Sequence, residues 1–258
     1  MAAVFDKMQV VSRIAFTRGW YFVIAWCHRI SGFLLVLLAW LHIYGLGFRV
    51  SGETTQGMKS GIVALLVWLM AIPLIFHVLN GSRLMLYESF EKRNDAEMVR
   101  LVSTLSAMYL VVLGVIMLLG SQTASPLLFW LCVSLIGVVL AYVIASRLRK
   151  TGHGIFWKLQ RISGAYMVPT VPGYVLSLYL KAPGEDDTNM AMATMQSTFG
   201  KPAFLIVWLC VVYHGAYGLF SVISDFVASR WIKAVVTVLV ILAALTIGAI
   251  GVKIIITA

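Results

Sequence analysis

Charged residues are scarce in this sequence. Of its 258 residues, 12% are Asp, Glu, Lys or Arg, whereas a soluble domain carries about 25%. This low share excludes a soluble enzyme and a highly charged disordered tail. Cysteine is rare as well, and the three cysteines show neither the pattern of a secreted disulfide scaffold nor the spacing of a metal site. Because each lies inside an apolar run, we expect Cys27, Cys132 and Cys210 to be small core residues.

Apolar residues are abundant instead. They make up 61% of the sequence, and the mean hydropathy is +0.94. Seven apolar runs are long enough to cross a bilayer, which takes about 20 residues, and most loops between them are short. The sequence therefore predicts an all-α, polytopic membrane helical bundle with about seven transmembrane helices. The predicted helices cover residues 20–47, 61–87, 99–120, 126–146, 155–180, 202–227 and 232–256.

Positive charge is unevenly distributed between the two ends of these helices. The formal net charge is +10, and 15 of the 20 Lys and Arg residues lie at one set of helix ends, including Lys7, Arg13 and Arg18. Such residues mark the cytoplasmic side, so we expect a cytoplasmic N-terminus, an outer C-terminus and an outward-facing acidic loop at 185–187. Short basic clusters of this kind are topology signals, not a nucleic-acid-binding stripe. We expect an integral protein of a bacterial-type inner membrane that binds no nucleic acid.

Two sequence elements occur twice, in the same order. The first is His28-Arg29-Ile30-Ser31-Gly32, which matches Gln160-Arg161-Ile162-Ser163-Gly164. The second is a histidine followed by a glycine one turn later and by an acid further on, as in His77, Gly81 and Glu88 and again in His214, Gly218 and Asp225. We predict two parallel three-helix halves, residues 1–120 and 154–258. A linking transmembrane helix within 121–153 then returns the chain to the cytoplasmic side.

The paired histidines indicate a cofactor. Ionisable residues inside membrane helices are costly and therefore mark function. Because His77 and His214 precede an acid by the same interval, both lie about 16 Å from the cytoplasmic edge at a rise of about 1.5 Å per residue. Two histidines at equal depth can ligate one iron from opposite sides, and Gly81 and Gly218 leave a flat surface for a macrocycle, so we predict a bis-His haem b. The alternative is that each histidine only hydrogen-bonds a neighbouring helix.

A second haem is a weaker prediction. His42 follows His28 by nearly four helical turns and lies on the same face, near the predicted outer surface. Its repeat-related position is Tyr174, and tyrosine is an uncommon haem ligand. We therefore expect one haem and not two.

The repeated motifs resemble those of a known family, the membrane anchor (cytochrome b) subunits of succinate dehydrogenase and quinol:fumarate reductase. The similar segments are Ala25–Gly32, His77–Arg83, Trp157–Gly164 and His214–Asp225. The resemblance covers roughly residues 20–120 and 155–257, as in a fusion of two small anchor subunits. The chain departs from the family at Ala25, where the motif has Ser, and at Phe226, where a Tyr often follows the acid.

The resemblance implies a function and a set of site residues. The function is to pass electrons between a cytoplasmic iron–sulfur subunit and membrane quinone. His77 and His214 would ligate the haem iron. The haem propionates would lie near His28, Arg83 and Arg161, and the quinone near Arg29, Ser31 and Asp225.

The resemblance also implies partner subunits. The sequence has no flavin, dicarboxylate or Cys-rich iron–sulfur motif, so FAD and iron–sulfur clusters are expected only in a flavoprotein subunit and an iron–sulfur subunit of the same complex. Alone, the chain would not turn over a dicarboxylate, although it would react with quinone. Two other functions fit the same seven helices: a transporter and a haem-free structural anchor.

Overall fold

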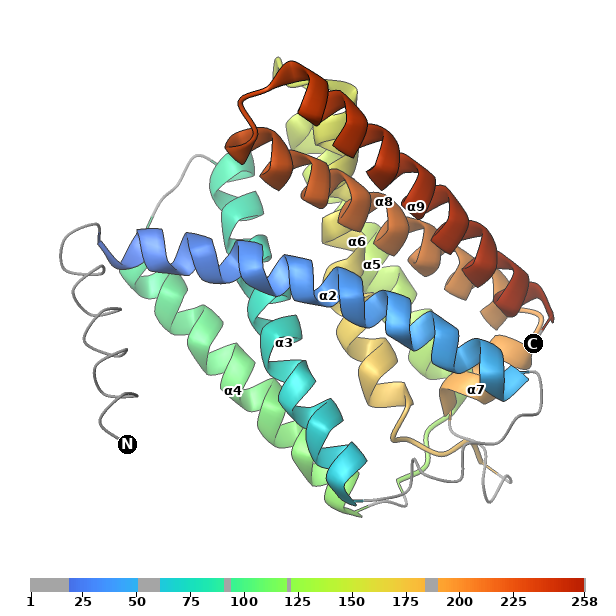
Figure 1. Cartoon of the computed structure of the whole chain (residues 1–258). Coiled ribbons are helices and arrows are strands. Elements are labelled where there is room, and N and C mark those ends of the chain that lie inside the picture. Colours follow the sequence, from blue (N-terminus) through green and yellow to red (C-terminus); the bar gives the residue numbers. More distant parts are fainter. Residues whose placement is uncertain (1–18, 51–60, 91–93, 120–121, 184–189, 258) are drawn as a thin grey trace, which may run out of the picture.

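The chain folds into a bundle of long helices (Figure 1). The computed structural model describes residues 19–50, 61–90, 94–119, 122–183 and 190–257. Within these ranges the chain forms eight helices and no strand. The helices are α2 (Trp20–Val50), α3 (Gly61–Phe90), α4 (Asp95–Leu119), α5 (Pro126–Leu148), α6 (Ile155–Ser177), α7 (Met190–Gln196), α8 (Gly200–Phe226) and α9 (Arg230–Thr257).

The predicted fold class is confirmed. The ends of the seven long helices differ from the predicted ends by at most four residues. Long apolar runs form helices in a bilayer because a helix satisfies its own backbone hydrogen bonds. At the weak break before α5, Ser125 accepts a hydrogen bond from the Leu128 amide, and Pro126 occupies the first turn, which together define where the helix begins. Lys7, Arg13, Arg18 and the loop 185–187 lie outside the described residues.

Six of the long helices are long and apolar enough to span a membrane. The remaining one, α6, has 23 residues and packs against α3, α5 and α8. Its buried positions include small or hydroxyl-bearing residues such as Gly164, Thr170, Gly173 and Ser177. Small residues let helix backbones approach closely within a membrane bundle, so α6 lies inside the protein and has little lipid-facing apolar surface.

The outer surface of the bundle is strongly apolar. Leu118 on α4, Tyr142 on α5 and Trp231 on α9 are 87%, 73% and 84% exposed, respectively. Large exposed side chains continue along α5 and α9, including Leu135, Ile136, Leu242 and Leu245. An exposed apolar surface of this extent is suited to contact with lipid and not with water.

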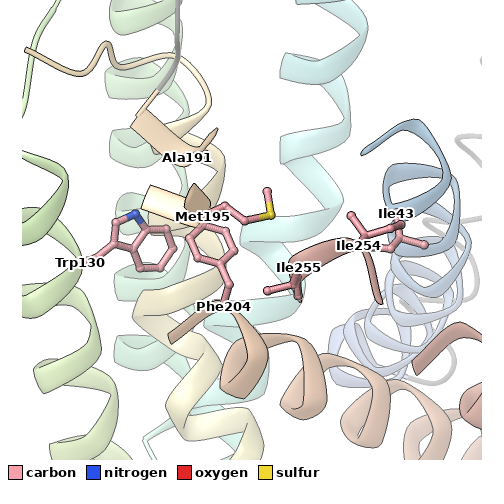
Figure 2. Packing of buried hydrophobic residues seen from close by; sticks show 7 residues of the cluster. All are labelled: Ile43, Trp130, Ala191, Met195, Phe204, Ile254 and Ile255. Atoms are coloured by element: carbon pink, nitrogen blue, oxygen red, sulfur yellow. The ribbon is translucent and has the colours of Figure 1, made fainter. Parts of the chain in front are cut away.

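The main hydrophobic core lies at one end of the bundle (Figure 2). It contains Ile43, Trp130, Ala191, Met195, Phe204, Ile254 and Ile255, which come from α2, α5, α7, α8 and α9. The short helix α7 follows the acidic loop at 185–187 and is not among the helices that the sequence predicts. Because Ala191 and Met195 are buried, α7 packs into the bundle and joins the ends of the longer helices.

Candidate functional site

Three of the histidines meet in the middle of the bundle, where α2, α3, α6 and α8 pack together. His77 on α3 stacks on His28 of α2, with ring centroids 4.0 Å apart and planes 4° from parallel. His214 on α8 lies edge-to-face with His77, at a centroid separation of 6.4 Å and an angle of 86°. The two histidines predicted as iron ligands are therefore neighbours, and His28 lies beside one of them.

The two halves of the chain hold their histidines with the same hydrogen bond. His77 Nδ1 lies 3.1 Å from the backbone carbonyl oxygen of His28. His214 Nδ1 lies 3.2 Å from the carbonyl oxygen of Gln160. Because His28 and Gln160 are repeat-related positions, the sequence repeat is also a repeat of contacts.

These hydrogen bonds determine which nitrogen of each ring is free. A carbonyl oxygen can only accept, so Nδ1 carries the proton in both His77 and His214. The unprotonated nitrogen of each ring is then Nε2, for which no hydrogen bond is found among the described residues. Metal-ligating histidines are commonly oriented in this way, by donation of the other ring N–H to a carbonyl.

Two glycines allow the rings to lie close to the helix backbone. A Cβ atom added to Gly32 would lie 2.8 Å from His77 Cε1, and one added to Gly164 would lie 3.1 Å from His214 Cε1. Gly32 and Gly164 are the last residues of the two repeated elements, so this packing also occurs twice. A larger residue at either position would push the histidine away from its carbonyl partner.

Gly81 and Gly218, the glycines one turn after each histidine, also lie between packed helices. A Cβ atom on Gly81 would lie 3.4 Å from His28 Cε1, and one on Gly218 would lie 3.8 Å from Gln160 Nε2. These glycines therefore face the side chains at the repeat-related positions of α2 and α6. They allow the helices to pack closely.

Two ion pairs join the two sequence repeats. Arg29 Nη2 on α2 lies 3.1 Å from Asp225 Oδ2 on α8. Arg161 on α6 makes two contacts with Glu88 on α3, from Nε and Nη2, each 2.8 Å long. In each pair, the arginine comes from one copy of the repeat and the acid from the other.

The two pairs differ in accessibility. The side chains of Arg29 and Asp225 are 36% and 52% exposed, compared with 26% for Arg161 and 33% for Glu88. The Arg29 guanidinium also lies over the Phe226 ring, at 5.5 Å from its centroid. The Arg29–Asp225 pair is thus more open and has fewer contacts, whereas the Arg161–Glu88 pair is bidentate and more firmly held.

The other predicted site residues are more dispersed. Ser31 is buried, donates to the His28 carbonyl oxygen and lies 3.2 Å from His77 Nδ1, so it belongs to the histidine cluster and not to the Arg29–Asp225 pair. Arg83 is 5% exposed. It pairs with Asp95 at the start of α4, where Nη1 lies 3.5 Å from Oδ1.

His42 lies apart from the histidine cluster, and its neighbour in the chain, Ile43, belongs to the main hydrophobic core. Its Nε2 atom is 2.5 Å from the hydroxyl oxygen of Tyr174 on α6. These two residues occupy repeat-related positions, and the structure brings them into contact with each other.

The chain matches one protein family twice. The family is described as the succinate dehydrogenase/fumarate reductase transmembrane subunit, and its model matches residues 21–116 and 144–249. The chain belongs to this family. No curated protein and no solved structure matches the chain. As a member of the succinate dehydrogenase/fumarate reductase transmembrane subunit family, with six apolar helices long enough to span a bilayer, the chain is an integral membrane protein.

The two matched segments divide the site between them. The first segment contains His28, Arg29 and His77, and the second contains Arg161, His214 and Asp225. A double match of this kind is consistent with a fused anchor subunit of the family.

Sequence reasoning missed some residues that organise this site. Glu88 was identified only as a marker of depth, yet it is the partner of Arg161. Gly32 and Gly164 were recognised as parts of a motif but not as the glycines that contact the histidine rings. The signal for both was present in the repeat, which has an acid at both Glu88 and Asp225 and a glycine at both Gly32 and Gly164.

Proposed function

We propose that this chain is the haem b-containing anchor of a succinate dehydrogenase or fumarate reductase complex, and that it passes electrons between an iron–sulfur subunit and membrane quinone. The observation that carries the proposal is the His77–His214 pair, whose Nδ1 atoms both contact backbone carbonyl oxygens. The family match supports the anchor role. The proposal adds to this role the binding of haem b and of quinone.

The ring separation is compatible with ligation of one iron. To hold one iron through their unprotonated Nε2 atoms, the two rings would have to be close neighbours. The centroids of His77 and His214 are 6.4 Å apart. Bound there, haem b supplies a one-electron carrier inside the membrane.

Three cationic or polar side chains near this pair are proposed to hold the propionates: His28, Arg83 and Arg161. Arg161 contacts Glu88 through two of its nitrogens, which leaves other donors of its guanidinium for a further carboxylate. Arg83 is buried, and its Nε has no hydrogen-bond partner among the described residues. A buried guanidinium with an unused donor is suited to binding an anion.

The quinone is proposed to bind at the Arg29–Asp225 pair. Reduction of a quinone takes two electrons and two protons, so the site must be close to both an electron donor and a proton source. Asp225 lies at the last turn of α8 and is half-exposed, so it can exchange protons with water and pass one to a quinone oxygen. Arg29 can donate hydrogen bonds to the same oxygen as negative charge develops on it. Ser31 contacts the His77 ring, so we assign it to the connection between the quinone and the histidine cluster.

One haem is proposed, because the Nε2 atom of His42 already forms a hydrogen bond with the Tyr174 hydroxyl. The two halves, residues 1–120 and 154–258, are proposed to be repeat units joined by the helix within 121–153. The repeated hydrogen bonds of His77 and His214 support that division.

The N-terminus is proposed to be cytoplasmic and the C-terminus outside. In this orientation Arg29 and Asp225 would lie beside the iron–sulfur subunit. FAD and the iron–sulfur clusters are assigned to the partner subunits.

The direct test is a reduced-minus-oxidised optical spectrum of the purified complex. We expect a b-type α-band after reduction and one haem per copy of this chain. An assembled complex that lacks this band would identify the chain as a haem-free structural anchor. A transporter would show neither the band nor the partner subunits.

A further inference from the structure

A cavity of about 290 Å³ lies between α2, α3 and α4, apart from the histidine cluster. Ten of the described residues line it, and seven of these are aliphatic or aromatic. No charged residue is among the ten. The cavity is therefore suited to an uncharged, mainly apolar molecule.

Two polar side chains in the cavity wall have no hydrogen-bond partner in the described part of the chain. Asn80 on α3 is 2% exposed, and its Nδ2 atom has no acceptor among the described residues. Ser106 on α4 has a buried hydroxyl that is also without a partner there. Buried donors are normally paired, and an unpaired donor is costly in a low-dielectric interior. By contrast, the third polar residue of the wall, Ser103, donates to the Val99 carbonyl oxygen at 2.9 Å.

The cavity is separate from the proposed haem and quinone sites. On α3, the residues Ile72, Phe76 and Asn80 are four residues apart and line the same side. The next residue, Gly81, faces His28 on α2. Adjacent positions of α3 therefore face different sites, with the cavity on the side towards α4.

The cavity is accessible from the bilayer. Ile72 is 41% exposed, and Ser103 at the opposite wall is also exposed. Water alone fits the site poorly, because the volume is many times the roughly 30 Å³ of one water and each buried water needs two to four polar partners. A molecule that enters from the membrane can supply both an apolar body and a hydrogen-bond acceptor.

We propose that this cavity binds an amphiphile whose carbonyl oxygen accepts hydrogen bonds from Asn80 Nδ2 and Ser106 Oγ. Its apolar part lies against the aliphatic and aromatic wall. The shared chemistry is a carbonyl group on a slender apolar body. Its source is either the ester of a membrane lipid or the ketone of a quinone.

Photo-crosslinking of the assembled complex in lipid nanodiscs tests this site. One sample carries a phosphatidylcholine with a diazirine near the ester, and the other carries an arylazido quinone. After irradiation, digestion and mass spectrometry, we expect one of the probes to label segments 72–80 or 99–110 at least fivefold more than the lipid-facing segment 235–245 of α9. Labelling by the lipid probe identifies an ester as the ligand, and labelling by the quinone probe identifies a ketone.

Three variants test the polar contacts. Asn80→Leu and Ser106→Val remove the two donors, and each is expected to lower labelling at least fivefold. Ser103→Ala is the matched control, because its hydroxyl is already bonded within α4, and its labelling should stay within twofold of the unmodified complex. If Asn80→Leu prevents assembly, Ser106→Val alone decides. Labelling by neither probe above the α9 level, or undiminished labelling in the donor variants, overturns the proposal.

Discussion

Replacing Gly32 by Ala places a methyl group against the His77 ring. The added Cβ would lie 2.8 Å from His77 Cε1, closer than normal van der Waals contact. The ring cannot easily move aside, because it stacks on His28 and its Nδ1 atom lies 3.1 Å from the His28 carbonyl oxygen. The substitution must therefore shift either α2 or the histidine.

The magnitude follows from two opposing terms. Overpacking in a close-packed interior costs about 1–3 kcal/mol, whereas Ala is favoured over Gly within a helix by about 1 kcal/mol. We expect Gly32→Ala to destabilise the protein by about 0–2 kcal/mol after this offset. The equivalent Cβ on Gly218 would have its nearest neighbour at 3.8 Å. Gly218→Ala should therefore be neutral or stabilising, by up to about 1 kcal/mol.

The apparent midpoint of thermal unfolding in detergent measures this difference. About 1 kcal/mol corresponds to roughly 2–4 °C for a chain of this size. The expected order of midpoints is Gly32→Ala lowest, then Gly164→Ala with its contact at 3.1 Å, then Gly81→Ala at 3.4 Å, and Gly218→Ala highest. A Gly32→Ala variant as stable as Gly218→Ala would refute the argument that the glycines are required for close packing of the histidines.

Three other substitutions test the remaining contacts. Asp225→Asn should lower quinone-linked turnover of the complex severalfold while haem content and artificial-dye activity stay unchanged, and an unchanged quinone rate would contradict the proposed site. Glu88→Gln removes the bidentate pair with Arg161 and should lower the apparent thermal midpoint by about 2–8 °C, since such a partly exposed pair contributes on the order of 1–2 kcal/mol. Asp225→Asn loses a single contact and should lower the thermal midpoint by less. A larger drop for Asp225→Asn than for Glu88→Gln would contradict the inference that the Arg161–Glu88 pair is the more firmly held. Tyr174→Phe removes the hydrogen bond to His42 at a cost of about 1 kcal/mol, and a measured change in haem content would contradict the assignment of one haem to the other histidines.

The helices of this protein could be predicted closely from the sequence because hydrophobic length alone determines a membrane crossing. The run predicted at 126–146 is the helix Pro126–Leu148, and the run predicted at 202–227 is Gly200–Phe226. The helix Met190–Gln196 was missed as an element because it is only seven residues long. Its burial depends on contacts with α5 and α8, which no local pattern reveals.

The site could be predicted only in part. Equal spacing to an acid correctly placed His77 and His214 beside each other, because residues at one depth on neighbouring helices can meet. Depth does not determine the direction in which a side chain points, so the contacts of Ser31 and Arg83 could not be predicted. That direction depends on the rotation of each helix against its neighbours, which brings Ser31 to the His77 ring and Arg83 to Asp95. The two ion pairs between the repeats depend on the same rotation.

The most direct test of the account is the haem content of four histidine variants, measured from the reduced-minus-oxidised spectrum of the assembled complex. His28 stacks on His77 at 4.0 Å, so the experiment must separate two neighbouring rings. His77→Ala and His214→Ala are each predicted to lose the b-type band. His28→Gln, which copies the repeat-related Gln160, and His42→Ala are predicted to keep it. Retention of the haem in His77→Ala together with its loss in His28→Gln would contradict the central claim that His77 and His214 are the ligands.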